Sequence, residues 1–163
     1  MAKYYNAMVV FEEIPDEITL AINITNCPCH CIGCHSKFLW EDVGTELTID
    51  ELDRLIEENK GITCVCFMGG DANPKEINDL AGEVATKSIC CFLPLKIAWY
   101  SGKDELSEDI EIGRFDYIKL GHYDERMGGL DKETTNQRLY KVVGYEDKDF
   151  ELKDITSKFW KKH

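Results

Sequence analysis

Residues 25–40 constrain this chain most, because they gather cysteines into one short stretch. Cys27, Cys31 and Cys34 follow the spacing C-x3-C-x2-C, and Cys29 lies between the first two. Thiolates so close in sequence can hold one metal centre, and a cubic iron–sulfur cluster usually takes four cysteine ligands. Three cysteines leave one iron open to a substrate or cofactor. The spacing therefore favours chemistry at a cluster over simple electron storage.

The same pattern resembles that of the radical S-adenosylmethionine (SAM) enzymes. Most of that superfamily has an aromatic residue just before the third cysteine, whereas this chain has Gly33 there. The glycine resembles one branch, the activating enzymes of anaerobic ribonucleoside-triphosphate reductase. The resemblance covers residues 18–143, and the tail at 145–163 carries little of it.

Zinc is the alternative at this segment, because cysteine and histidine at such spacing also bind zinc. The possible ligands in the segment are Cys27, Cys29, His30, Cys31, Cys34 and His35. A structural zinc site usually adds a second pair of ligands some distance away. Cys64 with Cys66, or Cys90 with Cys91, would have to supply it, and both spacings are poor for zinc. In the radical SAM interpretation Cys29 is not expected to be a ligand.

Size and charge narrow the class of protein. A chain of 163 residues is long enough for one domain, taken as residues 1–163, with its own core. No apolar run approaches the roughly 20 residues that span a bilayer, and no export signal is visible. We therefore expect a cytoplasmic protein with reduced thiols. The net charge of −12 argues against general nucleic-acid binding.

Hydrophobic patterns predict alternating strands and helices. Strands are expected at 8–11, 18–24, 62–68, 90–92 with 95–100, 115–120 and 142–150. Helices are expected at 48–61, from Asn73 onward and at 105–110, and residues 152–160 could form a strand or a short helix. Residues 25–47 are a long connection that carries the cysteines, and Phe38, Leu39 and Trp40 could close over them or simply join the core.

This alternation predicts an α/β fold with a parallel sheet. The chain is too short for an eight-stranded barrel, which needs about 250 residues. The family resemblance implies a compact partial, open β/α barrel of the radical SAM type.

Glycines and an acid follow the strand predicted at 62–68. In radical SAM enzymes a Gly-Gly-Glu motif at this place contacts the amino group of SAM, and Gly69, Gly70 and Asp71 resemble it. Asp71 is shorter by one methylene, so its side chain or only the glycine carbonyls could serve. Ser101 ends the next strand and resembles the family's strand end near the SAM ribose; an ordinary turn is the alternative.

A second family signature occurs later in the chain. Asn136, Gln137 and Arg138 resemble the Asn-Gln-Arg run of the reductase-activating branch. The resemblance makes Asn136 and Arg138 candidates for contacting SAM or for shaping the cluster pocket. Without it, Arg138 would be an ordinary surface or ion-pairing arginine.

The resemblance implies a specific reaction. Cys27, Cys31 and Cys34 would hold a [4Fe–4S] cluster whose open iron binds SAM. An electron donor such as a flavodoxin would reduce the cluster, SAM would split into methionine and a 5′-deoxyadenosyl radical, and that radical would generate a glycyl radical on the reductase. Alternatives are activation of another glycyl-radical enzyme, another radical SAM reaction, or a non-enzymatic zinc- or cluster-binding interaction module.

Overall fold

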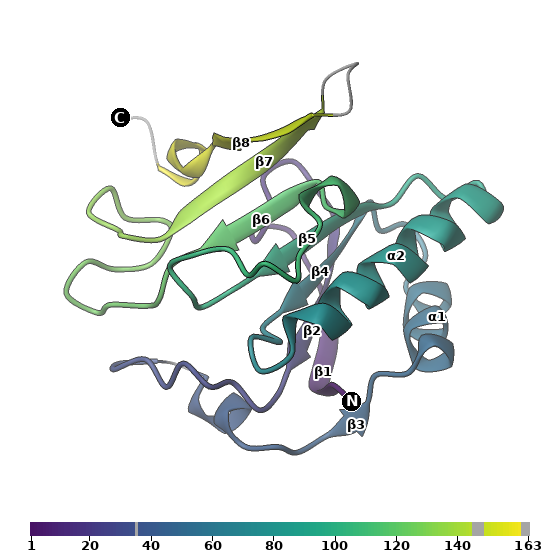
Figure 1. The fold of residues 1–163 in the computed structure, drawn as a ribbon, viewed down its shortest axis with the longest axis horizontal. Coiled ribbons are helices and arrows are strands. Elements are labelled where there is room, and N and C mark those ends of the chain that lie inside the picture. The colour runs from purple at the N-terminus through teal and green to yellow at the C-terminus, as the bar shows by residue number, and fades with distance from the viewer. Residues whose placement is uncertain (35, 145–148, 161–163) are drawn as a thin grey trace.

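The fold is built on one mixed β-sheet, seen in a computed structural model that describes residues 1–34, 36–144 and 149–160 (Figure 1). The described residues form eight strands in the spatial order β3-β1-β2-β4-β5-β6-β7-β8. Their bounds are β1 Lys3–Val10, β2 Thr19–Ile24, β3 Thr45–Glu46, β4 Cys64–Met68, β5 Lys96–Tyr100, β6 Tyr117–Leu120, β7 Arg138–Gly144 and β8 Phe150–Asp154. The sheet is not closed, because β3 and β8 lie at its two ends.

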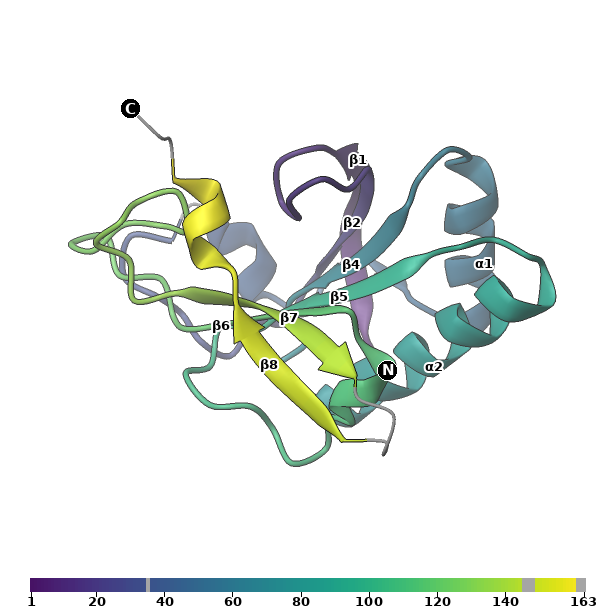
Figure 2. The same ribbon diagram turned by 90° about the horizontal axis from the view of Figure 1, so that it is seen from above.

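The centre of the sheet is parallel. Strands β2, β4, β5 and β6 pair in parallel and lie in chain order, whereas the flanking strands pair antiparallel. Helix α1 (Ile49–Glu58) connects β2 to β4, and α2 (Pro74–Cys90) connects β4 to β5. Both helices lie on the same face of the sheet (Figure 2). The prediction of an α/β fold is confirmed, and the predicted parallel pairing holds for the centre of the sheet.

Burial differs between the two faces of the sheet. Val65, Phe67 and Trp99 belong to the core beneath the helices. Cys64 and Cys66 point to the opposite face, where they pack with other buried residues in a smaller core. This confirms that these two cysteines act as core residues, since both are 0% exposed.

Helix α1 forms where the sequence predicts it. The Thr48 side chain accepts a hydrogen bond from the Glu51 backbone N–H at 3.1 Å, as a helix cap does. Leu52, Leu55 and Ile56 are buried. Ile49 is exposed, because it stands in the first turn, ahead of the buried stripe.

Helix α2 is longer than predicted. Pro74 is at its first turn, but the Asn73 side chain makes no capping hydrogen bond. The helix continues to Cys90, so the strand expected at 90–92 is wrong. Its last turn extends beyond the core, and the chain reverses at Phe92, which has φ of 53°. Apolar residues there are exposed, so they lack the buried contacts that would stabilise a strand.

Other boundaries shift as well. The helix predicted at 105–110 is absent from the described chain, where turns lead to a short 3-10 helix, Ile112–Arg114. The first strand spans Lys3–Val10 and so begins earlier than predicted, and β7 begins at Arg138. A strand or a short helix was predicted at 152–160, and the structure has both: strand β8 and a 3-10 helix, Thr156–Phe159.

Strand β2 is buried almost throughout, so its alternating sequence does not mark a half-exposed strand. Thr19 and Ala21 are buried, and Ile18 is exposed just ahead of the strand. In the described part of the chain, no helix has the length and apolar character needed to cross a bilayer.

Candidate functional site

The segment that carries the cysteines, residues 25–47, begins directly at the carboxyl end of β2. The first and last parts of this segment are joined by backbone hydrogen bonds. Asn26 N–H donates to Glu41 O and Cys27 N–H donates to Leu39 O, both at 2.9 Å. The Thr25 hydroxyl also donates to Val43 O at 2.6 Å. These bonds order the long connection, whose regular secondary structure is a 3-10 helix, Lys37–Trp40, and the short strand β3. We call residues 26–36 the cysteine loop.

Cysteines of the loop are accessible to ligands, because Cys27, Cys29, Cys31 and Cys34 are half-buried free thiols. Backbone N–H of Cys34 donates to Cys31 O at 3.1 Å, and Ser36 N–H donates to the Cys34 sulfur at 3.4 Å. Within the described ranges, no three Cys, His, Asp or Glu side chains are grouped as a metal site. His35, a possible zinc ligand, lies outside the described residues.

Both the backbone conformation and the close packing at position 33 require a glycine. Its φ is 78°, and a Cβ atom there would lie 2.4 Å from Glu125 Oε2. Glu125 belongs to the β6–β7 loop, residues 121–137, which therefore lies against the cysteine loop. A cavity of about 580 Å³ separates the rest of the two loops and is lined by Cys29, Cys31 and His122 among others.

Aromatic side chains brace the cysteine loop. Trp40 stacks on His30 with ring centroids 4.4 Å apart and planes 9° apart. Phe38 instead contacts Tyr5 of β1 at 4.8 Å. Trp40 thus packs against the cysteine loop, as expected if it closes over the cysteines. Phe38 instead attaches the segment to the sheet.

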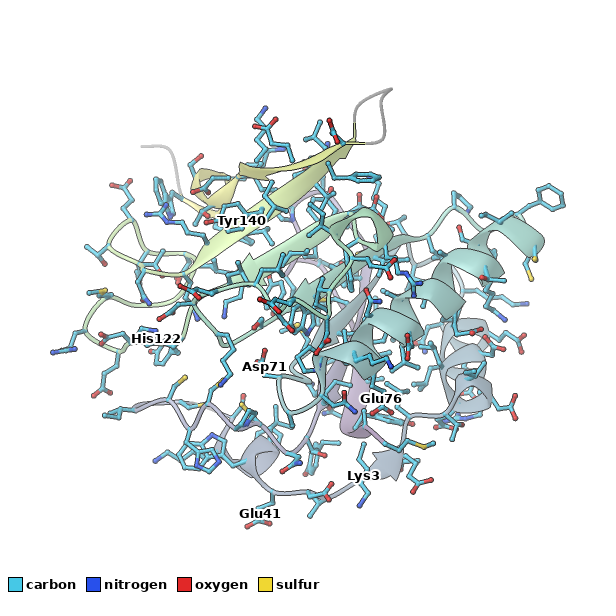
Figure 3. All side chains as sticks on the ribbon, viewed as in Figure 1. Lys3, Glu41, Asp71, Glu76, His122 and Tyr140 are labelled. Carbon is cyan, nitrogen blue, oxygen red and sulfur yellow. The ribbon has the colours of Figure 1, made fainter. Side chains whose placement is uncertain are left out.

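Asp71 joins the cysteine loop to the ends of two strands. One carboxylate oxygen accepts a hydrogen bond from the Ser101 hydroxyl, and the other accepts from Gly102 N–H at 2.8 Å. The Cys29 thiol lies 3.7 Å from that second oxygen. The structure therefore brings Asp71 and Ser101 together, next to the loop. Figure 3 shows Asp71 and His122 at the end of the sheet nearest the segment that carries Glu41.

Cys29 differs from its neighbours in electrostatic environment. Burial, followed by the nearby Asp71 carboxylate and Cys27, raises the pKa of the Cys29 thiol to about 12. A thiol with such a pKa donates a hydrogen bond to Asp71 and resists ionisation. This environment supports the interpretation that Cys29 is a structural partner of Asp71.

Gly69 and Gly70 adopt φ values of 109° and 95° at the end of β4. Gly69 O accepts a hydrogen bond from the Trp99 indole at 2.7 Å, and Gly70 O accepts from Asn73 N–H at 3.0 Å. Each carbonyl keeps one lone pair for a ligand. A Cβ atom on Gly70 would lie 2.5 Å from the Ile77 side chain, so glycine there also permits close packing.

The Asn-Gln-Arg run anchors the β6–β7 loop. Asn136 Nδ2 donates to His122 O at 3.1 Å, whereas Asn136 Oδ1 is buried with no hydrogen-bond partner among the described residues. Arg138 Nη1 lies 3.7 Å from Asp154 Oδ2 on β8. Arg138 therefore contacts the far edge of the sheet, whereas Asn136 bonds to His122, which lines the cavity.

The remaining cysteines do not supply a second zinc-binding pair. Cys64 and Cys66 are fully buried, and burial raises the pKa of both thiols, that of Cys64 to about 12. Cys90 and Cys91 are exposed at the far end of α2. That helix has 17 residues, which places its end ~25 Å from the strand ends that hold the site.

Lys119 is the residue that sequence reasoning missed. It lies in β6, is 7% exposed, and its ammonium donates to Ser101 O at 2.9 Å and Gly121 O at 2.7 Å. Burial lowers the pKa of Lys119 to about 8, opposed first by Asp71 and then by Cys31, Cys29 and Cys27. A lysine inside an otherwise buried apolar strand was the available signal.

A second feature missed from sequence is the pair of His122 and Asp104. His122 Nδ1 lies 2.8 Å from Asp104 Oδ1, and the hydrogen bond lowers the pKa of that carboxyl. The pair ties the β6–β7 loop to the turn after β5. No local pattern marks it, because the partners are 18 residues apart.

Comparisons of the chain with protein-family models, with curated proteins and with solved structures gave no match in any of the three.

Replacing Lys119 by Met should stabilise the metal-free protein by roughly 3 kcal/mol near pH 7, because each unit between pKa values of 8 and 10.5 corresponds to about 1.4 kcal/mol. Unfolded lysine keeps its proton up to its ordinary pKa of 10.5, whereas the folded protein loses it above about 8. Wild-type stability therefore rises through this window, and the advantage of the variant disappears above it. Urea unfolding at several pH values measures both effects.

The matched control is Lys158→Met, which removes an equal charge from an exposed position. It should leave the free energy of unfolding within about 0.5 kcal/mol of wild type. An equal gain in both variants would mean that net charge, and not burial of Lys119, limits stability.

Proposed function

We propose that this chain is a radical SAM enzyme that activates anaerobic ribonucleoside-triphosphate reductase by generating a glycyl radical on it. The observation that carries the proposal is the placement of three cysteines with C-x3-C-x2-C spacing on one ordered loop, beside the carboxyl ends of neighbouring parallel strands. Open α/β sheets bind ligands at that edge. The open sheet, with its central strands in chain order and both helices on one face, supports a partial barrel of the radical SAM type.

The kind and number of the donors suit a cubic cluster with one open iron, although the described side chains are not gathered around one point. Cys27, Cys31 and Cys34 are half-buried free thiols, and the N–H of Ser36 already donates to the Cys34 sulfur. Cys29 is the fourth thiol, and its hydrogen bond to Asp71 gives it another role. Cys27, Cys31 and Cys34 would hold the cluster, which would supply the electron for reductive cleavage of SAM.

The residues at the strand ends have the chemistry to orient SAM. Asp71 offers a carboxylate to the methionine ammonium, and the glycine carbonyls before it each retain a lone pair. Ser101, held by Asp71, fixes the end of β5. The buried Asn136 Oδ1, which lacks a partner among the described residues, is a further acceptor on a residue that bonds to His122 of the cavity wall. Together they bind and orient the cofactor next to the three thiols.

Gly33 supports the reductase-activating branch in particular. An aromatic side chain at this position, as in most of the superfamily, has no space, because even a Cβ atom would overlap Glu125. The Asn-Gln-Arg run supports the same branch through its anchoring of the loop that contains Glu125. A partner protein fits the open sheet better than a small substrate does, since a second chain can cover the exposed edge of the site.

Single replacement of Cys27, Cys31 or Cys34 by Ala should abolish cluster uptake and 5′-deoxyadenosine formation. Cys29→Ala should retain cluster uptake and product formation, because the Cys29 thiol bonds to Asp71 and is not a cluster ligand. Cys91→Ala, at the far end of α2, is the matched control. The measurement is anaerobic reconstitution with iron and sulfide, reduction, addition of SAM, and chromatography of the nucleoside product.

Two results would contradict this assignment. Loss of product in a folded Cys29→Ala protein would make Cys29 a ligand. A wild-type protein that holds zinc, takes up no cluster and leaves SAM intact would favour a non-enzymatic interaction module.

Asp71→Ala should weaken SAM binding about tenfold, or ~1.4 kcal/mol, because it removes the carboxylate and releases Ser101 and Gly102. Binding to the reconstituted protein can be followed by isothermal titration calorimetry. Asp79→Ala, on the exposed face of α2, removes the same charge and should bind SAM like wild type. Equal affinities in all three proteins would assign SAM binding to the glycine backbone.

A further inference from the structure

Lys119 is a buried cation without a carboxylate partner in the described part of the chain. Its ammonium donates to the carbonyls of Ser101 and Gly121, and none of the ion pairs formed between described residues includes it. By contrast, Lys96 at the other end of the same sheet face pairs with Glu17 at 2.6 Å. Carbonyl dipoles satisfy hydrogen bonds but do not neutralise the charge, so burial of Lys119 costs folding free energy.

The groups that most favour the charged form of Lys119 belong to the site. Ser101 links them directly: its carbonyl accepts from Lys119, its hydroxyl donates to Asp71, and Asp71 accepts from the Cys29 thiol. Asp71 is also the largest electrostatic influence that favours the charged lysine, followed by Cys31, Cys29 and Cys27. A short chain of contacts therefore connects the ammonium to the cysteine loop.

Charge on the cysteine loop changes when it binds metal. Cysteines that ligate a metal do so as thiolates, and they lose their protons on binding. Three thiolates that hold a divalent ion have a net charge of minus one together with it. A cubic cluster in its oxidised form leaves the same net charge, and one-electron reduction makes it minus two. Loading therefore adds negative charge to that of the Asp71 carboxylate, which already favours the charged form of Lys119 in the empty protein.

On its other side, Lys119 borders a cavity of about 780 Å³ over the sheet face opposite the helices. Tyr100, Gln137 and Glu13 line the same cavity. The Tyr100 ring centroid lies 6.0 Å from the Lys119 ammonium. The lysine is therefore held at a fixed place between the loop and the cavity, with little freedom to turn toward solvent.

We propose that Lys119 is the counter-charge of the cysteine loop: a positioning residue whose fixed ammonium stabilises the negative charge that the loop gains on loading and again on reduction. The reduction part of this inference rests on the proposed function, whereas the loading part holds for any thiolate-bound metal. The lysine destabilises the empty protein and strengthens the loaded one. It also raises the reduction potential, so that a weaker electron donor suffices.

The first test compares the midpoint potential of reconstituted wild type with that of Lys119→Met, measured by redox titration with electron paramagnetic resonance. At a fixed potential the variant should have about tenfold less reduced cluster, which corresponds to about 59 mV for one electron. Lys158→Met, which lines the same cavity but is exposed, should match wild type. Equal potentials in all three proteins at equal cluster content would overturn the counter-charge.

The second test needs no cluster. Anaerobic titration of the metal-free protein with Co²⁺, followed by thiolate-to-cobalt absorption, should give an affinity about tenfold lower in Lys119→Met than in wild type or Lys158→Met. Equal affinities would overturn the proposal. Cobalt binding with the expected difference, but no cluster uptake, would support the counter-charge and reject the radical SAM function. A wild-type protein that takes up neither metal nor cluster overturns both.

If Lys119→Met does not fold, Lys119→Gln replaces it. Glutamine keeps an N–H donor for the carbonyls of Ser101 and Gly121 but carries no charge. The same losses of potential and cobalt affinity are expected, and wild-type values in a folded glutamine variant would assign Lys119 a hydrogen-bonding role alone.

Discussion

The Asp71 carboxylate is the interaction on which the site depends. It receives hydrogen bonds from Ser101 and Gly102, after β5, and from Cys29, after β2, while it stands itself after β4. Parallel neighbouring strands make this possible, because their carboxyl ends meet at one edge of the sheet. A glutamate would carry its oxygens one methylene farther out, so the shorter acid suits a role in joining these segments as well as in meeting a ligand.

Opposite charges in the site are separated by a single residue. Ser101 accepts from the Lys119 ammonium through its carbonyl and donates to Asp71 through its hydroxyl. A direct ion pair would neutralise both groups and leave neither for a ligand. Separation keeps a buried cation one residue away from the anion that contacts the cysteine loop, at a cost in stability that a purely structural core would avoid. Such a cost is typical of functional sites.

Sequence patterns predicted those features that depend on neighbouring residues. The cap at Thr48, the buried run of β4 and the position of the cysteines after β2 are of this kind. Patterns failed where distant contacts decide, as for Asp71 with Cys29, 42 residues apart. The helix predicted at 105–110 gives way to turns, in which Asp109 N–H donates to the Ser107 hydroxyl at 3.2 Å. Serine competes in this way with helical backbone bonds.

The β6–β7 loop explains how a signature far from the cysteines can act on them. Asn136 holds His122 O, Gln137 Nε2 donates to Gly121 O at 3.4 Å, and Arg138 pairs with β8. These bonds fix both ends of the loop whose Glu125 lies against Gly33. Among these side chains, the buried Asn136 Oδ1 has no hydrogen-bond partner in the described part of the chain. The run is therefore better understood as an anchor that holds the β6–β7 loop at a fixed distance from the cysteines. The glycine before Cys34 leaves the space that the loop needs at this distance.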